Sequence, residues 1–427
     1  MKPQHVGETA SEIEEKWRSK RWEGIVRKYT AEDVLRLRGT WPVRYITAEK
    51  ASEKLWYMLH TTPYVFALGA VTGSQAVQMV EAGFKAIYVS GWQVAADMNV
   101  AGQTYPDLGL YPYNSVPLLV KRIVQALQRA DQIQTLERKG RVDYFAPIIA
   151  DGEAGFGGPL HAFELMKSMI EAGAAAVHLE DQSPGERRCG HLGSKVLVPT
   201  RRFISILSSA RLAADVLGVP SIIIARTDAI GASHITGDGD PVDSKYIRGG
   251  KTSDGYYRIE AGLDMAIDRG LAYALYAELI WFETSKPSLE EAKRYAEAIH
   301  SKYPQKLLAY NLSPSFNWAK TVDSDTLVDF QRKLASYGYK YQFITLAGFH
   351  SLNTHIFQLA RDLAERGMPA YAQLQRVEIE LEKHGYRAFK HQSYVGVHYY
   401  DEVLKAVEGE GAATAAMEKS TEREQFI

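Results

Sequence analysis

One residue run stands out for its chemistry: Arg187-Arg188-Cys189-Gly190-His191, which contains the single cysteine of the 427-residue chain. One cysteine excludes an intramolecular disulfide. The neighbouring arginines and His191 favour the thiolate form of Cys189, because positive charge stabilises the ionised sulfur. The surrounding segment, 183–194, is rich in glycine and polar residues that cannot pack a core. We therefore expect a mobile loop carrying a reactive thiol of lowered pKa; an inert cysteine is the alternative.

Carboxylates form a second group with chemical potential. Asp151 and Glu153 stand at alternate positions before a glycine-rich run, Glu180 closes a later apolar segment, and Asp107 lies in a turn sequence. Carboxylates without clustered cysteine or histidine partners favour Mg²⁺ or Mn²⁺ over zinc. The glycine-rich run alone is weak support for phosphate binding, since no Walker-type lysine and hydroxyl pair follows it.

Neutral hydrogen-bonding groups and an arginine form a third group. Asn311, Ser313 and Ser315 follow an apolar run, and Arg226 follows another. Amides, hydroxyls and a guanidinium are the groups with which a pocket holds a carboxylate ligand. A simple turn is the alternative for the 311–315 segment. Together the three groups predict a site for a small anionic molecule.

Eight short apolar runs must position these residues. Each is followed by a helical pattern, which predicts an α/β fold, a (β/α)₈ barrel of the TIM type. The runs end in polar clusters, which in a closed barrel converge on one mouth. A doubly wound open sheet is the competing fold, but its strand ends would form a row too long to meet one small ligand. The expected strands are 64–68, 86–89, 145–149, 175–179, 221–225, 279–282, 306–309 and 341–344.

The barrel is expected to span residues 63–367, with the mobile loop at 183–194 and an insertion at 229–257 that is rich in Gly, Asp and Ser. Residues 1–62 are expected to be helical, because Thr30 precedes Asp33, and Ser11 precedes Glu14, at capping-box spacing. Residues 368–427 are expected to hold helices and a C-terminal tail. By composition alone the tail, Glu408–Ile427, is expected to be disordered.

Composition excludes several classes of protein. Lys and Arg total 50 against 51 Asp and Glu, so no basic surface predicts a nucleic-acid partner. The apolar stretches are too short to cross a bilayer. One cysteine and no apolar signal segment near the first residues predict a cytoplasmic protein.

The chemistry-bearing segments resemble those of the isocitrate lyases. Residues 187–191 are similar to that family's Lys-Lys-Cys-Gly-His signature, and the resemblance covers nearly the whole chain. Arg187 replaces the family's first lysine, and Leu312 replaces a cysteine that is common after the asparagine. The other similar tracts, in the family's order, are Tyr88–Trp92, Asp151–Gly158, His178–Gln182, Trp281–Thr284, Asn311–Trp318 and Thr345–His350.

The resemblance implies reversible Mg²⁺-dependent cleavage of isocitrate into glyoxylate and succinate. It implies that Cys189 delivers a proton as general acid, and that Tyr88 or Glu283 is the base, a choice the sequence leaves open. It also implies a homotetramer with helices exchanged between neighbouring barrels, and a tail that folds over the closed loop. The implied metal ligands are Asp151, Asp107, Glu153 and Glu180. The implied substrate-binding residues are Ser90, Gly91, Trp92, Gly190, Arg226, Asn311, Ser313, Ser315 and Thr345, with His191 stabilising the enolate-like succinate fragment.

Other activities are run on the same kind of barrel. 2-Methylisocitrate lyase, with the same cysteine loop, is the nearest alternative as a main or side activity. Phosphoenolpyruvate-mutase-like chemistry is disfavoured by the Cys-Gly-His run. A barrel that serves only as a binding or assembly scaffold is disfavoured by the carboxylates, thiol and arginine that are all present.

Overall fold

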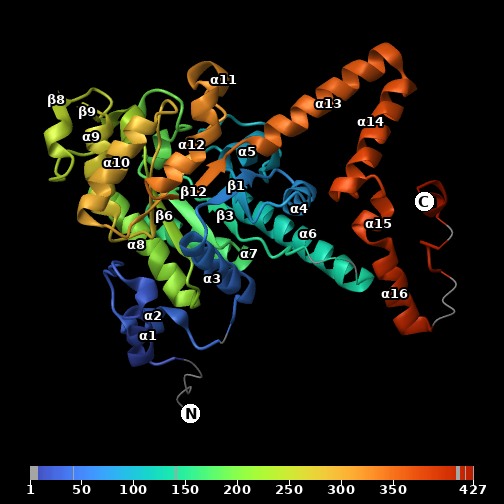
Figure 1. Cartoon of the computed structure of the whole chain (residues 1–427). Helices are drawn as coiled ribbons and strands as arrows, with labels where there is room; N and C mark the ends of the chain where they lie inside the picture. The colour runs from blue at the N-terminus through green and yellow to red at the C-terminus, as the bar shows by residue number, and fades with distance from the viewer. Residues whose placement is uncertain are drawn as a thin grey trace.

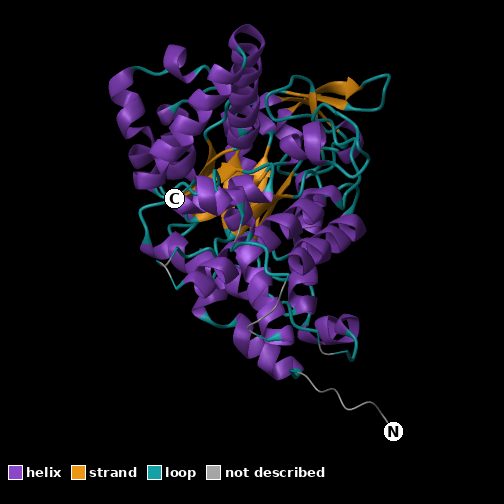
Figure 2. Ribbon diagram, turned by 90° about the vertical axis from the view of Figure 1, so that its right-hand side faces the viewer, coloured by secondary structure: helices purple, strands orange, loops and turns teal. Residues whose placement is uncertain are grey.

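Eight parallel strands close into a barrel in the computed structural model, which describes residues 8–41, 43–138, 140, 142–409, 414–418 and 420–426 (Figures 1 and 2). The strand order around the barrel is β1-β12-β11-β10-β6-β4-β3-β2. This closure confirms the predicted TIM-type fold and excludes the open sheet. The barrel strands are β1 (Val65–Gly69), β2 (Ala86–Val89), β3 (Ile148–Asp151), β4 (Ala176–Glu180), β6 (Ile222–Thr227), β10 (Leu279–Phe282), β11 (Leu307–Asn311) and β12 (Tyr339–Ile344).

The strands are buried on both faces, and the alternation of side chains divides the core into two parts. In β2, Ala86 and Tyr88 belong to the cluster that fills the barrel, with Trp281 and Phe343. Ile87 and Val89 of the same strand belong instead to the larger cluster between barrel and helices. Near-continuous apolar strands are what a parallel sheet with two covered faces requires. The alternation thus places Tyr88 on the barrel axis.

An outer layer of helices surrounds the strands (Figure 2). Ser288 and Asp323 cap two of them, each side-chain oxygen accepting a hydrogen bond from a backbone N–H of the first turn. The main helices of this layer are α4 (Gly73–Glu81), α6 (Ser115–Glu137), α7 (Pro159–Ala172), α8 (Thr200–Leu217), α9 (Leu263–Tyr273), α10 (Leu289–Lys302) and α12 (Ser324–Ser336). After the last barrel strand, α13 (Ala347–Arg366) leaves this layer (Figure 1). Shorter helical segments are α5 (Gly91–Gln93), a π-helical turn (Val94–Met98) and α11 (Trp318–Thr321).

The N-terminal residues form α1 (Ala10–Trp17), a 3₁₀ turn (Lys20–Trp22), α2 (Ala31–Arg38) and α3 (Ile46–Thr61). Thr30 and Asp33 make the predicted capping box at the start of α2. The prediction of a box at Ser11 is wrong. Thr9 caps α1 instead, with Glu12 as its carboxylate partner, because α1 begins one residue before Ser11.

The insertion after β6 is ordered as part of a second, four-stranded sheet. Its strand order is β5-β7-β9-β8, and β5 comes directly after the cysteine loop. The insertion therefore pairs with the chain that leaves the loop, which the sequence did not predict. The elements are β5 (Lys195–Leu197), a 3₁₀ turn (Ala229–Gly231), β7 (Ala232–Ile235), a second turn (Ser244–Tyr246), β8 (Ile247–Lys251) and β9 (Tyr257–Ile259).

The C-terminal helices extend away from the barrel as an arm (Figure 1). The arm begins with α13 and continues with α14 (Met368–Leu381), a 3₁₀ turn (Glu382–His384), α15 (His391–Val395) and α16 (Val397–Glu408), and the tail that follows contains α17 (Thr421–Gln425). In the tail, buried Glu422 accepts hydrogen bonds from the N–H groups of Gln392 and Ser393. Asp401 of α16 accepts two more, from Ala416 and Met417.

These contacts contradict the composition-based expectation of disorder for 414–418 and 420–426. Residues 410–413, 419 and 427, on which the same expectation fell, lie outside the described residues. Among the helices of the described chain, none combines the length and apolarity needed to cross a bilayer.

Candidate active site

A small cavity of about 40 Å³ lies where the carboxyl ends of the barrel strands converge. In such barrels this end carries the active site. The cavity brings together most of the predicted site residues. Its lining residues are Tyr88, Ser90, Trp92, Asp107, Asp151, Arg187, Cys189, Gly190, His191, Arg226, Glu283, Asn311, Ser313, Ser315, Thr345 and Leu346.

Three predicted residues do not line the cavity but contact residues that do. The Gly91 N–H donates to Asp151 Oδ2 at 2.9 Å. Glu153 and Glu180 both pair with Arg187. Leu346 and Arg187 line the cavity although neither was predicted as a site residue.

Asp151, at the end of β3, is fixed by several donors. It accepts from the Gly91 N–H, from the Glu153 N–H at 2.9 Å and from the Tyr88 hydroxyl at 3.3 Å. Glu153 has a left-handed φ of 53°, which an L residue seldom adopts, in the turn that follows β3. In this turn the backbone N–H of Glu153 points back to the Asp151 carboxylate.

Two buried residues that the sequence analysis did not select support this group. The His178 Nε2 lies 2.8 Å from the Tyr88 hydroxyl and 3.4 Å from Asp151 Oδ1. Burial lowers the pKa of His178 to about 4, so its ring is neutral. Tyr111 donates to Glu153. His178 could have been selected, because it lies inside a recognised tract; Tyr111 carried no sequence signal.

Arg187 places its guanidinium among three of the predicted metal ligands. Its Nε lies 2.8 Å from Glu180 Oε1, and it also forms ion pairs with Asp107 and Glu153. Burial lowers the pKa of Arg187 to about 10. Within the part of the chain that the structure describes, no three His, Cys, Asp or Glu side chains form a ready cation site. The carboxylates surround a guanidinium in this arrangement.

The buried charges of the site are nonetheless unbalanced. Burial and the charges of Asp151 and Glu180 raise the pKa of Glu153, and burial also raises the pKa of Glu180. Glu153 Oε2 forms an ion pair with Arg187, and Glu180 Oε2 lies 3.2 Å from Arg226 Nη1, so two guanidinium groups serve more carboxylates than they can neutralise. Buried carboxylates without compensating cations are costly, so the site is suited to a divalent cation. The buried carboxylates are Asp107, Asp151, Glu153, Glu180, Asp228 and Glu283, and the buried cations are Arg187, Lys195 and Arg226.

Cys189 lies on the loop between β4 and β5, and the structure corrects the expected direction of its pKa. Burial raises the pKa of the thiol. A hydrogen bond with the His191 backbone and the charges of Arg187 and Arg226 lower it, but by less. The Cys189 N–H donates to the Asp107 carbonyl at 2.9 Å. The loop is thus folded over the mouth, and the thiol is protonated at neutral pH.

Arg226, at the end of β6, joins the loop to the opposite wall of the cavity. It donates to both oxygens of Asp228 at 2.9 Å, and its Nη1 lies 3.5 Å from Glu283 Oε2. Glu283 accepts from Asn311 Nδ2 at 3.3 Å, and His191 Nε2 lies 3.5 Å from Glu283 Oε1. Neither His191 Nε2 nor Asn311 Oδ1 forms a hydrogen bond with any described residue. These two atoms are available to a ligand.

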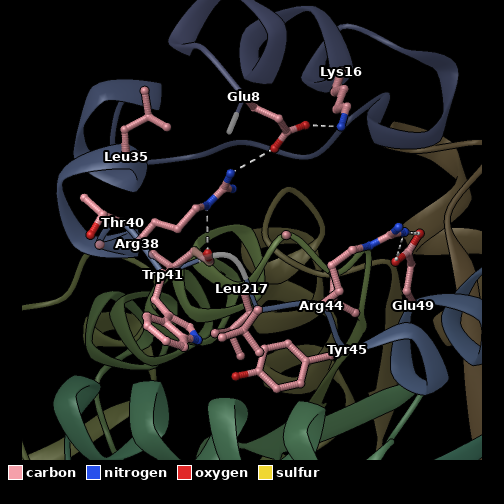
Figure 3. A pocket seen from close by; sticks show the side chains of 15 residues that line it. Glu8, Lys16, Leu35, Arg38, Thr40, Trp41, Arg44, Tyr45, Glu49 and Leu217 are labelled. Carbon is pink, nitrogen blue, oxygen red and sulfur yellow. Dashed lines mark hydrogen bonds and ion pairs between the residues drawn. The ribbon is translucent and has the colours of Figure 1, made fainter. Parts of the chain in front are cut away.

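A larger cavity of about 550 Å³ lies far from this mouth, between the N-terminal helices and the end of α8 (Figure 3). Its charged groups are already paired. Glu8 pairs with Lys16 and with Arg38, and Arg44 lies 3.2 Å from Glu49. Because the described charged residues of this cavity are paired with one another, the barrel mouth is the better candidate despite its smaller volume.

Comparisons with known proteins point to one family. The isocitrate lyase family matches residues 9–253 and 249–426. An isocitrate lyase of Halalkalibacterium halodurans is 59% identical over 420 residues, which are 98% of each chain. An isocitrate lyase of Escherichia coli is 52% identical over 425 residues, or 97% of this chain and 98% of that one.

Among solved structures, an oxaloacetate acetylhydrolase has a TM-score of 0.59 at 22% identity, covering 84% of this chain and 98% of that chain. A 2,3-dimethylmalate lyase has a TM-score of 0.58 at 21% identity, covering 84% and 96%. At these identities the two structures support the fold alone.

Proposed function

The chain belongs to the isocitrate lyase family, and we propose a division of labour among its cavity residues for the cleavage of isocitrate into glyoxylate and succinate. The activity itself follows from close similarity over the full length. One observation carries the assignment of roles. The thiol of Cys189, the guanidinium of Arg226 and the carboxylate of Asp151 line a single cavity at the barrel mouth.

The acidic side of the mouth fits a magnesium ion. Asp151 would hold it, with Asp107, Glu153 and Glu180 contributing directly or through water, because carboxylate oxygens are the ligands that Mg²⁺ prefers. When bound, the ion polarises the hydroxyl and carboxylate of isocitrate that become glyoxylate. The excess of buried carboxylates over buried cations at the mouth supports this assignment. Arg187, which faces the same oxygens, would then have to rearrange.

The base that removes the hydroxyl proton is best assigned to Glu283. Burial and the Asp151 charge raise the pKa of the alternative, Tyr88, well above its ordinary value, which disfavours a phenolate. Glu283 lines the cavity and is held by Asn311 and Arg226. Tyr88 is better suited to donate a hydrogen bond. Glu283→Gln is therefore expected to lower kcat more than Tyr88→Phe.

Cys189 is proposed as the acid. As the carbon–carbon bond breaks, its electron pair passes to the succinate carbon, and the thiol proton is transferred to that carbon. The raised thiol pKa supports this role, because the proton must be present when the bond breaks. Donors around the cavity stabilise the enolate-like charge that the succinate fragment carries after the bond breaks and before the proton arrives. These donors are His191, Arg226, Asn311, Ser313, Ser315 and Thr345, with Ser90, Gly91, Trp92 and Gly190 completing the substrate site.

A coupled assay tests the proposal. Purified protein is given isocitrate or 2-methylisocitrate, with Mg²⁺ or with excess chelator, and the oxo-acid product is measured. We expect rapid glyoxylate formation that chelation abolishes and Mg²⁺ restores. Faster cleavage of 2-methylisocitrate than of isocitrate would show that 2-methylisocitrate is the main substrate. Full activity in chelator would contradict the role of the carboxylates.

The assembly is proposed to be a homotetramer that exchanges helices. The arm formed by α13 to α16 leaves large apolar side chains in solvent, among them Phe357, Met368 and Val407, which are 68%, 69% and 79% exposed. Large apolar side chains exposed along these helices are what an association surface would cover. Sedimentation velocity measures the mass directly, and Phe357→Lys is expected to dissociate the assembly.

The tail is proposed to cover the closed cysteine loop, as the family resemblance implies. Its described hydrogen bonds go to α15 and α16 of its own chain. Exchange of the arm between barrels would carry the tail to the mouth of another copy. Hydrogen exchange tests this arrangement. Glyoxylate with a succinate analogue should slow exchange in the loop and the tail together.

A further inference from the structure

The backbone on both sides of Cys189 is held by two buried side chains. On one side, the Gln182 amide bonds both backbone groups of Arg188, accepting from its N–H at 3.0 Å and donating to its carbonyl at 2.8 Å. On the other side, Lys195 Nζ donates to the Gly190 carbonyl at 2.8 Å. The position of the thiol over the mouth therefore depends on these contacts.

Lys195 is an unusual residue for this task because it is almost completely buried. It is 1% exposed at the start of β5, and burying an ammonium group is costly unless it is paired. Its second partner is Asp228 Oδ1 at 2.7 Å. Asp228 in turn accepts both hydrogen bonds of Arg226, a residue of the cavity wall. A continuous path thus runs from Arg226 through Asp228 and Lys195 to Gly190.

The fold reserves space for this ammonium group. A Cβ on Gly231 would lie 2.8 Å from Lys195 Cε and 2.9 Å from Nζ, closer than side-chain carbons normally approach. Lys195 itself does not line the cavity, so it cannot touch substrate there. Asp228 already has a bidentate guanidinium partner and does not need a second cation to be neutralised. What Lys195 alone provides is the bond to the Gly190 carbonyl.

We infer that Lys195 is a positioning residue, which ties the closed conformation of the cysteine loop to the Arg226–Asp228 pair. A substrate carboxylate that engages Arg226 orients Asp228 and Lys195, and Lys195 then fixes Gly190 so that the thiol faces the reacting carbon. This inference rests on the role proposed above for Cys189. Its consequence is that loss of the ammonium group affects the chemical step far more than ground-state binding.

The test compares Lys195→Met with a matched control, Lys306→Met. Lys306 is a partly buried lysine that also donates to a carbonyl, that of Ala277, but it is outside the cavity and its pKa is lowered to about 8 by burial. For Lys195→Met we expect kcat to fall by about 10²-fold, the cost of a catalytic group displaced by about 1 Å, while KM changes by less than about threefold. Lys306→Met should keep the wild-type kcat.

A second measurement reports closure directly. Glyoxylate with succinate should protect Cys189 of the wild type from iodoacetamide, and Lys195→Met should lose that protection while keeping its Tm. Because protection reports loop position, it remains informative even if Cys189→Ser proves that the thiol is not the acid. Wild-type kcat and full protection in Lys195→Met would overturn the inference.

If Lys195→Met does not fold, Gly231→Ala provides the same test with the charge retained. Its φ lies outside the left-handed region, so alanine is compatible with the backbone, and only Lys195 must move. The same loss of kcat and of protection is expected. Retention of both would overturn the inference.

Discussion

Gly190 offers a sharp test of whether the loop closes as the structure shows. Its φ lies outside the left-handed region, so Gly190→Ala creates no backbone strain. An alanine Cβ would, however, lie 2.4 Å from Arg226 Nη2 and 2.7 Å from Glu283 Cγ. Neither neighbour can yield easily, because Arg226 is held by Asp228 and Glu283 by Asn311. The loop itself must therefore move.

The size of the effect follows from that movement. Ordinary contact begins near 3.4 Å, so relieving the 2.4 Å approach takes a shift of about 1 Å. A shift of that size can lower kcat by about 10²-fold, or about 2.7 kcal/mol of transition-state stabilisation. Because an open loop avoids the clash, global stability should change by less than about 0.5 kcal/mol.

The assay measures glyoxylate release against isocitrate concentration, together with Tm. Gly193→Ala is the matched control, because it lies in the same loop, its φ is also outside the left-handed region and its added Cβ would meet no atom within 4 Å. Wild-type kcat in Gly190→Ala would refute the closed geometry as the reactive one. An equal loss in Gly193→Ala would instead indicate that the loop tolerates no added side chain at all.

Further predictions concern the thiol, the metal and the tail. Cys189→Ser should fold normally yet lose at least about 10²-fold in kcat, since a hydroxyl is a far weaker acid; near wild-type turnover would exclude Cys189 as the donor. Alkylation needs the thiolate, so the raised pKa predicts that the rate of Cys189 alkylation in the closed state rises only above the ordinary thiol pKa; an inflection below that value would contradict the burial argument. Asp151→Asn should raise the Mg²⁺ concentration for half-maximal activity by at least about tenfold, measured by metal titration after chelation, and an unchanged titration would remove Asp151 from the metal site. Deleting residues 411–427 should reduce turnover strongly while leaving Tm of the barrel nearly unchanged, because the described tail contacts are with α15, α16 and Phe389 rather than with the barrel strands; an unaffected kcat would show that the tail has no role in closure.

The barrel could be predicted because its signal is repeated and local. Each strand is an apolar run of a few residues, and two of them, 86–89 and 279–282, were predicted at their observed bounds. The observed helix α9 begins at Leu263, after Ile259 ends the short strand β9. The second sheet was missed for a related reason: β8, Ile247–Lys251, is exposed and glycine-rich, so no apolar alternation marks it.

Site residues could be predicted where their type and their position after a predicted strand indicated a function. Contacts between residues far apart in the sequence could not be predicted. Cys189, Asp151 and Arg226 were identified because each follows a strand or lies in a distinctive loop. The placement of Arg187 against Asp107, a residue 80 positions earlier, was not, because only the folded chain brings the two together. Lys195 was missed as well. Nothing in the sequence separates a buried lysine from the many lysines that face solvent.

Cys189 shows why the residues adjacent in sequence can predict the wrong direction for a pKa shift. Adjacent arginines predict a lowered pKa, and the charges of Arg187 and Arg226 do act in that direction. Burial opposes them and is the larger effect, because the folded loop partly buries Cys189 against the mouth. Arg187, moreover, is engaged by Asp107, Glu153 and Glu180. A thiol that stays protonated is the form from which a proton can be donated, so the corrected pKa supports the acid role better than the expected one. The reactive thiolate should belong to the open loop, where water returns and burial no longer disfavours the charge.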